Sequence, residues 1–204
     1  MNGFARRREQ SKDEIRRAAG ELFSQFGVDR VSIADIARKA GVSQATIYNN
    51  FGSKETLVRE FVTAAVEDLV SRFEPILASK RPYREKMAAF FQSIGQIVAE
   101  GSPSSADSTI FTSRSDLLND PEIKKIREEA QEKMIGMLLD LVRQGKQQGQ
   151  VNQGISETTL RIYFTVFMDV FTHPVNQHQY HKHPAAIQEL GLLMMYGLSG
   201  KRKS

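Results

Sequence analysis

The sequence predicts an all-α protein with about nine helices, arranged as a small N-terminal domain and a larger helical bundle. Apolar residues recur at spacings of three and four along nearly the whole chain, and no stretch shows the sustained alternation of a β-strand. Glycine, serine and proline interrupt this pattern at intervals that match helix ends. With 204 residues, of which 40% are hydrophobic, the chain is long enough to bury a substantial core.

We assign residues 1–55 to the N-terminal domain and residues 56–204 to the bundle. The first predicted helix begins near residue 12, with Ser11 as its N-cap, and ends at Gly27. Its apolar stripe comprises Ile15, Ala18, Ala19, Leu22, Phe23 and Phe26.

Two short helices joined by a glycine turn follow in this domain. Ser32 can accept a hydrogen bond from the free N–H groups that open the first of them, and Asp35 lies near its positive end. Gly41 ends this helix, because glycine adopts the left-handed conformation at little cost. Ser43 is a second N-cap, for a helix over residues 44–51. The pattern predicts a helix-turn-helix, so the domain holds three helices.

The last of these helices carries no formal charge. Ile47 and Phe51 are spaced i, i+4 and can anchor one face of it. Asn and Gln can pair bidentately with adenine, Thr and Ala methyl groups can touch the thymine methyl, and a Tyr hydroxyl can reach a phosphate. We therefore predict that this helix reads base edges in DNA through its outward residues, Gln44, Ala45, Thr46, Tyr48, Asn49 and Asn50.

A longer motif surrounds this helix. Phe23 and Gly27 give F-x-x-x-G, and residues 32–54 give S-x-x-x-I-A-x-x-A-G-V-S-x-x-x-x-Y-x-x-F-x-x-K. Over residues 11 to 60 the chain thereby resembles the DNA-binding domain of the TetR family of bacterial transcription regulators. Many members carry histidine where this chain has Asn50. The resemblance implies that phosphates are bound by Ser32, Ser43, Tyr48 and Lys54, and that bases are faced by Gln44, Ala45, Thr46 and Asn49.

The bundle is predicted to contain six helices. The first carries Leu57, Phe61, Ala65, Leu69 and Phe73 before Pro75, and it joins the two domains, so its tilt could couple them. Asp120 followed by Pro121 is a strong signal for a helix start. The six helices lie near residues 54–74, 84–100, 109–118, 121–148, 156–173 and 184–198.

The last two helices are apolar on more than one side, and such helices need cover on both faces. One face can meet the core and the other a second copy of the chain, which predicts a homodimer through a four-helix interface. The TetR resemblance implies the same dimer. Two reading helices at a fixed spacing require a near-palindromic operator in double-stranded DNA.

The resemblance also implies that the bundle binds a small molecule that releases the DNA. Flexible methionines and flat aromatic rings suit an apolar or amphipathic ligand. Aromatic residues and methionines at helical spacing nevertheless form ordinary core more often than they line a pocket. Our candidates for the ligand site are Phe90, Phe91, Phe111, Met134, Met137, Tyr163, Phe167 and Met168.

All four histidines fall in one predicted loop between the last two helices: His173, His178, His181 and His183. Imidazoles at this density could bind zinc, nickel or copper, and a metal-responsive regulator is therefore the alternative hypothesis. No Asp, Glu or Cys joins them as a further ligand, so our main interpretation includes no metal and no cofactor.

Composition narrows the function classes. There is no cysteine, which excludes disulfides and a thiol nucleophile, and there is no H-E-x-x-H motif, so we do not expect an enzyme. No apolar stretch approaches the ~20 residues that span a bilayer, which predicts a cytoplasmic protein without a membrane anchor. A helical dimer that binds partner proteins remains a third class; the uncharged reading helix argues against it.

The basic excess lies with the predicted DNA-binding domain. Residues 1–60 hold 11 Lys and Arg against 8 Asp and Glu, a balance of +3 out of the total of +4. Arg6, Arg7 and Arg8 precede the first predicted helix. They form either a basic arm that follows the DNA or a frayed solvated tail.

Overall fold

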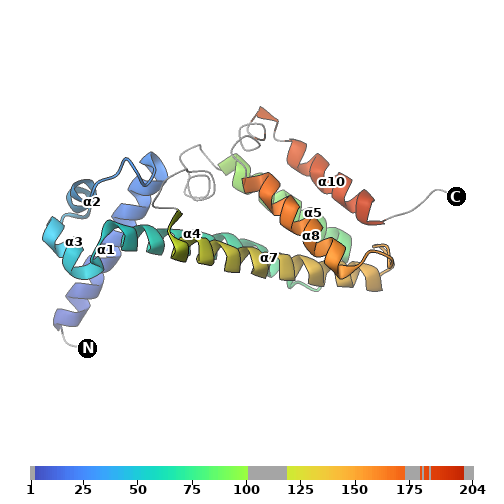
Figure 1. The fold of residues 1–204 in the computed structure, drawn as a ribbon, viewed down its shortest axis with the longest axis horizontal. Helices are drawn as coiled ribbons and strands as arrows, with labels where there is room; N and C mark the ends of the chain where they lie inside the picture. Colours follow the sequence, from blue (N-terminus) through green and yellow to red (C-terminus); the bar gives the residue numbers. More distant parts are fainter. Residues whose placement is uncertain (1–2, 101–118, 173–179, 181, 184, 200–204) are drawn as a thin grey trace. The chain divides into compact units, whose positions relative to one another are not determined.

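The computed structural model describes residues 3–100, 119–172, 180, 182–183 and 185–199, and these contain eight helices and no strand (Figure 1). The all-α prediction is confirmed, and the number of helices is close to the nine expected. The helix predicted near residues 109–118, and with it Phe111, lies outside the described residues. The helices are α1 (Gly3–Phe26), α2 (Ile33–Ala40), α3 (Gln44–Phe51), α4 (Lys54–Leu77), α5 (Tyr83–Glu100), α7 (Pro121–Gln147), α8 (Glu157–Thr172) and α10 (Ala185–Ser199).

The described residues fall into two compact units. The first unit contains the described residues of Met1–Val66 and Pro103–Arg127. The second unit contains the described residues of Glu67–Ser102 and Glu128–Ser204. Consequently α4 and α7 each contribute residues to both units, whereas α1, α2 and α3 belong entirely to the first.

The first unit is built on α1, which packs against both α2 and α3. Phe23 of α1 is fully buried, and its ring meets that of Phe61 of α4 edge to face, with centroids 5.4 Å apart. Ile36 of α2 and Ile47 of α3 are also fully buried. The short helices α2 and α3 are therefore held by a shared core, because helices of eight residues are marginal in isolation.

The helix α1 begins at Gly3, well before the predicted start near residue 12. Arg6, Arg7 and Arg8 are thus helical residues, so their predicted place before the first helix and the frayed tail are both wrong, while their contact with DNA stays a prediction. Ala, Arg, Glu and Gln are strong helix formers. The side-chain hydrogen bond from Gln10 to Glu14, at 3.1 Å, adds a stabilising pair at spacing i, i+4.

The helix α4 continues through Pro75 to Leu77, three residues beyond the expected end. Proline lacks one N–H donor, but in the last turn few further helical bonds depend on it. The Ala78 N–H still donates to the Glu74 carbonyl, at 2.8 Å. The buried face of α4 is also rotated from the predicted stripe, since the buried residues are Leu57, Val58, Val62, Val66, Val70, Phe73 and Leu77.

Within the first unit, the start of α7 is fixed by Asp120. Its Oδ1 accepts hydrogen bonds from the backbone N–H of Glu122, at 2.9 Å, and of Ile123, at 3.3 Å, as predicted for an N-cap. Arg59 of α4 forms an ion pair with Glu122, and its Nε lies 3.8 Å from Asp120 Oδ1. This contact ties the first turn of α7 to the first half of α4.

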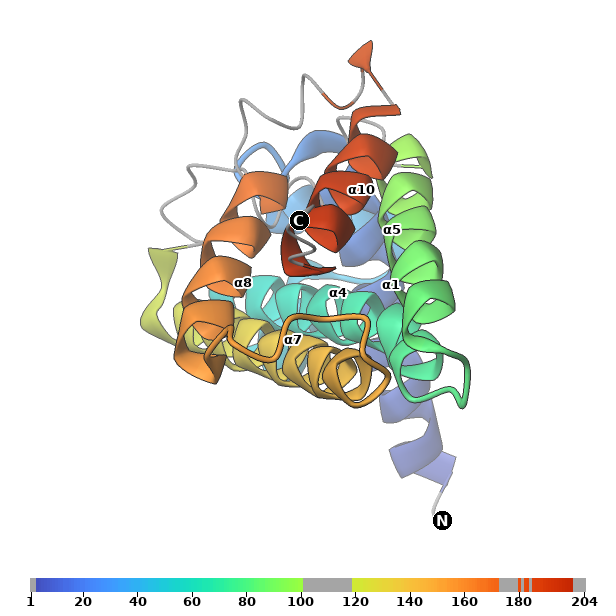
Figure 2. The same ribbon diagram turned by 90° about the vertical axis from the view of Figure 1, so that its right-hand side faces the viewer.

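The second unit holds a continuous apolar core. In both views α5, α8 and α10 lie on one side of α7 (Figures 1 and 2). A chain of aromatic contacts runs through it, with ring centroids 5.0 Å apart for Phe73 and Phe90, 5.5 Å for Phe90 and Phe91, and 5.7 Å for Phe91 and Phe167. The buried ammonium of Lys86 donates to the Leu77 carbonyl, at 2.7 Å, and so satisfies the end of α4.

Among the described helices, none is both long enough and apolar enough to cross a membrane.

Candidate nucleic-acid interface

The start of α2 is a complete capping box. Ser32 is extended, with φ −96° and ψ 160°, and its Oγ accepts a hydrogen bond from the Asp35 N–H at 3.2 Å. In return the Asp35 carboxylate accepts from the Ser32 N–H at 3.0 Å. Hydrogen bonds from the Ser32 hydroxyl and backbone hold the pKa of the Asp35 carboxyl below its usual value. The predicted cap is confirmed, while the phosphate contact of Ser32 stays a prediction.

The turn between α2 and α3 has the predicted conformation. Gly41 is left-handed, with φ 69° and ψ 28°, and the Val42 N–H donates to the Ala37 carbonyl at 3.0 Å. Ser43 then caps α3, since its Oγ accepts from the Thr46 N–H at 3.1 Å. The two short helices are thus the helix-turn-helix that the sequence indicated.

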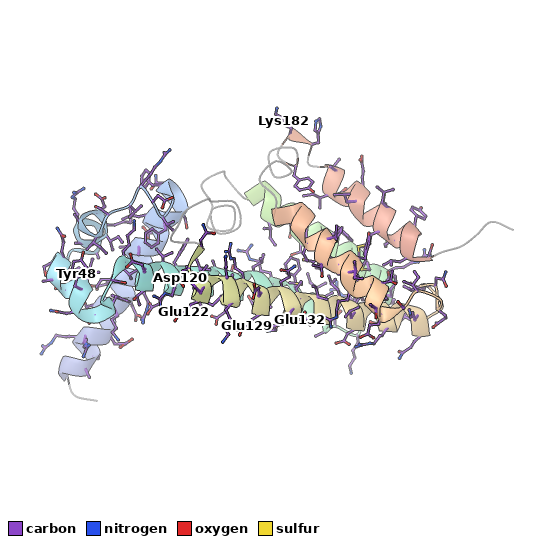
Figure 3. All side chains as sticks on the ribbon, in the orientation of Figure 1. Tyr48, Asp120, Glu122, Glu129, Glu132 and Lys182 are labelled. Atoms are coloured by element: carbon purple, nitrogen blue, oxygen red, sulfur yellow. The ribbon has the colours of Figure 1, made fainter. Side chains whose placement is uncertain are left out.

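The helix α3 presents a polar, uncharged face to solvent. Ile47 and Phe51 are buried, as expected from their i, i+4 spacing. Tyr48 is 49% exposed and lies on the outer face of α3 (Figure 3). The Thr46 hydroxyl lies 2.9 Å from the Ser43 hydroxyl, so it is already engaged within the turn. The exposed candidates are Ser32, Ser43, Gln44, Ala45, Tyr48 and Asn49.

Lys54 is the first residue of α4 and is partly buried. Just before it, Gly52 ends α3 with φ 79°, and the Ser53 hydroxyl accepts from the Thr56 N–H at 3.3 Å. Ser32, Ser43 and Lys54 therefore stand at the starts of three successive helices, where free N–H groups and positive helix ends favour an anion.

One contact at this surface was missed by the sequence analysis. The Nε of Arg8 donates a hydrogen bond to the Asn50 Oδ1, at 3.2 Å, between residues 42 positions apart. Arg16, two turns further along α1, lies over the Phe51 ring at 5.6 Å from its centroid. The side of α1 that carries these arginines consequently runs along the C-terminal end of α3.

The candidate ligand residues are mostly part of the core of the second unit. Phe90, Phe91, Met134 and Phe167 are buried there, and Met137 and Met168 pack against it. Tyr163 is 41% exposed, and its ring stacks on that of Phe167 with centroids 6.1 Å apart. Contact of these residues with a ligand stays a prediction.

The metal hypothesis gains no support. His173, His178 and His181 lie outside the described residues, and His183 is exposed. In the described part of the chain, no group of three or more His, Asp or Glu side chains could hold a metal ion.

Sequence comparisons identify relatives of this interface. Residues 15–61 match the model of "Bacterial regulatory proteins, tetR family". The repressor KstR2 of Mycolicibacterium smegmatis is 30% identical over 80 residues, and this match covers 39% of either chain, well under two thirds of the repressor. The fatty acid metabolism regulator protein of Bacillus subtilis is 25% identical over 165 residues, which cover 80% of this chain and 83% of that protein.

Structural comparisons extend the likeness to the bundle. The fatty acid degradation regulator FadR of Bacillus halodurans superposes with a TM-score of 0.68 at 19% identity, covering 92% of this chain and 96% of that one. FadR of Bacillus subtilis in complex with stearoyl-CoA gives a TM-score of 0.66 at 19% identity, covering 94% and 100%. At this identity the comparison shows the shared fold.

Proposed function

We propose that this chain is a transcriptional repressor of the TetR family of bacterial regulatory proteins, whose model matches its residues 15–61, and that it binds a specific operator. The family is one of DNA-binding regulators and not of enzymes. The observation that carries the proposal is the solvent-exposed face of α3, which holds amides and a phenol but no charge. A surface of this kind discriminates bases by hydrogen bonding, whereas a cationic surface attracts every phosphate alike.

In this proposal residues 1–55 read the DNA. Gln44, Ala45, Thr46 and Asn49 face base edges in the major groove. Ser32, Ser43, Tyr48 and Lys54 bind phosphates and thereby set the register of α3. Ser32 and Ser43 use their hydroxyl oxygens as acceptors in the capping hydrogen bonds, and the Ser32 O–H donates to the Asp35 carboxylate. The donors for an anion are therefore the free backbone N–H groups at these helix starts, together with the Ser43 hydroxyl once it turns from Thr46.

We propose that residues 56–204 form a domain for dimerisation and effector binding. Large apolar side chains are exposed on α8 and α10, where an unpartnered surface is costly in water. We call this set the dimer face; it consists of Ile162, Tyr163, Val166, Leu192, Leu193 and Tyr196. A second copy seated on this face makes a four-helix interface and presents two copies of α3 to a near-palindromic operator.

The operator itself is the first test. Selection of binding sites from a random DNA pool at near-physiological salt is expected to enrich an inverted repeat, because non-specific phosphate attraction is then suppressed. A pool that shows no enrichment at any salt concentration contradicts the proposal, provided that the protein is dimeric and free of small molecules by mass spectrometry.

The Tyr48→Phe variant should bind this operator about tenfold or more weakly, since a hydrogen bond to a charged phosphate contributes about 1.5–3 kcal/mol. The ring stays in place, so packing is unchanged and only the hydroxyl is lost. Fluorescence anisotropy with labelled operator measures the change, and Tyr83→Phe is the matched control, because Tyr83 begins α5 and lies outside both the proposed DNA site and the dimer face. Equal affinity of the two variants would remove Tyr48 from the phosphate contacts, and unchanged binding by Tyr48→Ala would remove it from the site.

For the effector, we propose an amphipathic ligand with a long acyl chain that releases the operator. One support is the likeness to regulators named for fatty acid metabolism. The other is the apolar core of the second unit, with Tyr163 at its edge and Phe111 as a further candidate. The core residues concerned are Phe90, Phe91, Met134, Met137, Phe167 and Met168. Each buried methylene contributes about 0.8 kcal/mol, so a long chain supplies most of the affinity.

Stearoyl-CoA should therefore lower the operator affinity about tenfold or more, while coenzyme A alone leaves it unchanged. The same anisotropy assay measures both, with the acyl-CoA kept below its micellar concentration. If stearoyl-CoA binds by calorimetry but the operator affinity stays the same, the release mechanism is wrong. If it does not bind, the acyl class is wrong, although the repressor proposal stands.

A further inference from the structure

The N-terminal turns of α1 carry three consecutive arginines, of which Arg8 contacts the proposed reading helix. Arg6, Arg7 and Arg8 are all exposed and helical. Of these, Arg8 is joined directly to α3 by its hydrogen bond to Asn50 in the last turn. This contact links the basic start of the chain to the surface that would face DNA.

The charge of Arg8 is available, unlike that of Arg16 on the same helix. Arg16 lies 2.8 Å from the Glu60 carboxylate, 3.0 Å from that of Asp13 and 3.5 Å from that of Glu9. No carboxylate of the described residues lies within ion-pair distance of Arg8. Only its Nε is used by Asn50, so both Nη groups keep their four N–H donors free.

We propose that Arg8 binds a DNA phosphate at the C-terminal end of α3, and that Asn50 is a positioning residue that holds the guanidinium there. This inference rests on the proposed function, because it presupposes that α3 enters the major groove. A helix without charge must take its phosphate-neutralising cations from neighbouring elements, and Arg8 is such a cation in direct contact with α3. The free Nη edge has the forked geometry that suits a phosphate.

The position of Asn50 favours positioning over base reading. Its side-chain oxygen accepts from Arg8, whereas bidentate recognition of adenine needs both the oxygen and the nitrogen of the amide. Asn50 is also partly buried, while Gln44 and Asn49 are exposed. The guanidinium further lies by the negative end of the α3 dipole, which stabilises a cation there.

Salt dependence of operator binding tests the phosphate contact. Each phosphate contact contributes about 0.9 to the slope of log affinity against log salt concentration, so Arg8→Gln in a two-copy complex should reduce the slope by about 1.8. Arg17→Gln is the matched control. Arg17 is exposed on the same helix, nine residues further on. At 3.6 residues per turn it therefore points about 180° away from Arg8. The salt slope of Arg17→Gln should consequently equal that of the unmodified protein.

A slope for Arg8→Gln equal to that of Arg17→Gln overturns the inference. Both variants are measured on the operator obtained by selection, so a failure of the proposed function shows itself earlier, as the absence of any enriched operator. Circular dichroism of both variants confirms that α1 and α3 remain helical.

The positioning role of Asn50 has its own readout. Asn50→Ala should weaken operator binding in the unmodified background but have no effect when combined with Arg8→Gln, because its effect is transmitted through Arg8. If Asn50→Ala weakens binding equally in both backgrounds, or changes the sequence selected from the random pool, then Asn50 contacts the DNA itself and the positioning role is wrong.

Discussion

Leu193→Asp should leave the protein folded but monomeric and lower its operator affinity about 100-fold or more. Leu193 is 68% exposed on α10, so in the single chain the new carboxylate stays hydrated and costs little. In the proposed dimer the same side chain enters the interface. Because the two copies are related by a two-fold axis, each contributes one buried carboxylate. Uncompensated buried charges cost several kcal/mol each, which is enough to dissociate the two copies.

The loss of DNA affinity follows from the loss of the second reading helix. Two linked reading heads gain about 100- to 10,000-fold over one, because the second binds from a high effective concentration. Sedimentation velocity measures the association state, and anisotropy measures operator binding. Gln92→Asp, which adds the same charge at an exposed position of α5, should remain dimeric. A dimeric Leu193→Asp protein would place the interface elsewhere.

The helix-turn-helix was predictable because its determinants are local. Ser32 and Ser43 cap helices through hydrogen bonds that reach only three residues along the chain. Gly41 provides a backbone conformation that other residues adopt at a cost. The residues that make these interactions lie within a few positions of one another in the sequence, so their spacing was sufficient to locate both helices.

The contacts of α1 were not predictable in this way. The sequence placed Arg8 before the first helix, whereas it lies within α1 and meets Asn50, 42 positions away. Side-chain contacts at such separation depend on how helices pack, and no local spacing encodes them. The same holds for α4, whose buried side is set by its neighbours. It keeps Leu57 and Phe73 of the predicted stripe, but Val58, Val62 and Val66 are buried in place of Phe61, Ala65 and Leu69.

The structural role of Gly191 is likewise evident only from how the helices pack. A Cβ atom built at this position of α10 lies 2.6 Å from Cγ and 2.7 Å from Cδ2 of Phe91. The Phe91 ring is itself buried and contacts the rings of Phe90 and Phe167, so it cannot swing aside freely. The close approach of α10 to α5 therefore depends on the absence of a side chain at Gly191.

Gly191→Ala should accordingly lower the free energy of unfolding by about 1–2 kcal/mol, although alanine is the better helix former. The gain in helix propensity is about 1 kcal/mol, whereas forcing a methyl group into a packed core typically costs 1–3 kcal/mol or more. Here the overlap is with a ring held on several sides, so we expect overpacking to dominate. Urea unfolding followed by far-ultraviolet circular dichroism measures the difference, and the absence of tryptophan makes that signal preferable to fluorescence.

Gly136→Ala is the matched control for this substitution. Gly136 lies inside α7, and a Cβ atom there meets nothing within 4 Å, so the change should stabilise the protein by up to about 1 kcal/mol. Adding Phe91→Leu to Gly191→Ala should recover part of the loss, because the smaller side chain leaves room for the methyl group and the two effects are then non-additive. If Gly191→Ala proves as stabilising as Gly136→Ala, α10 does not rest closely on α5 in solution.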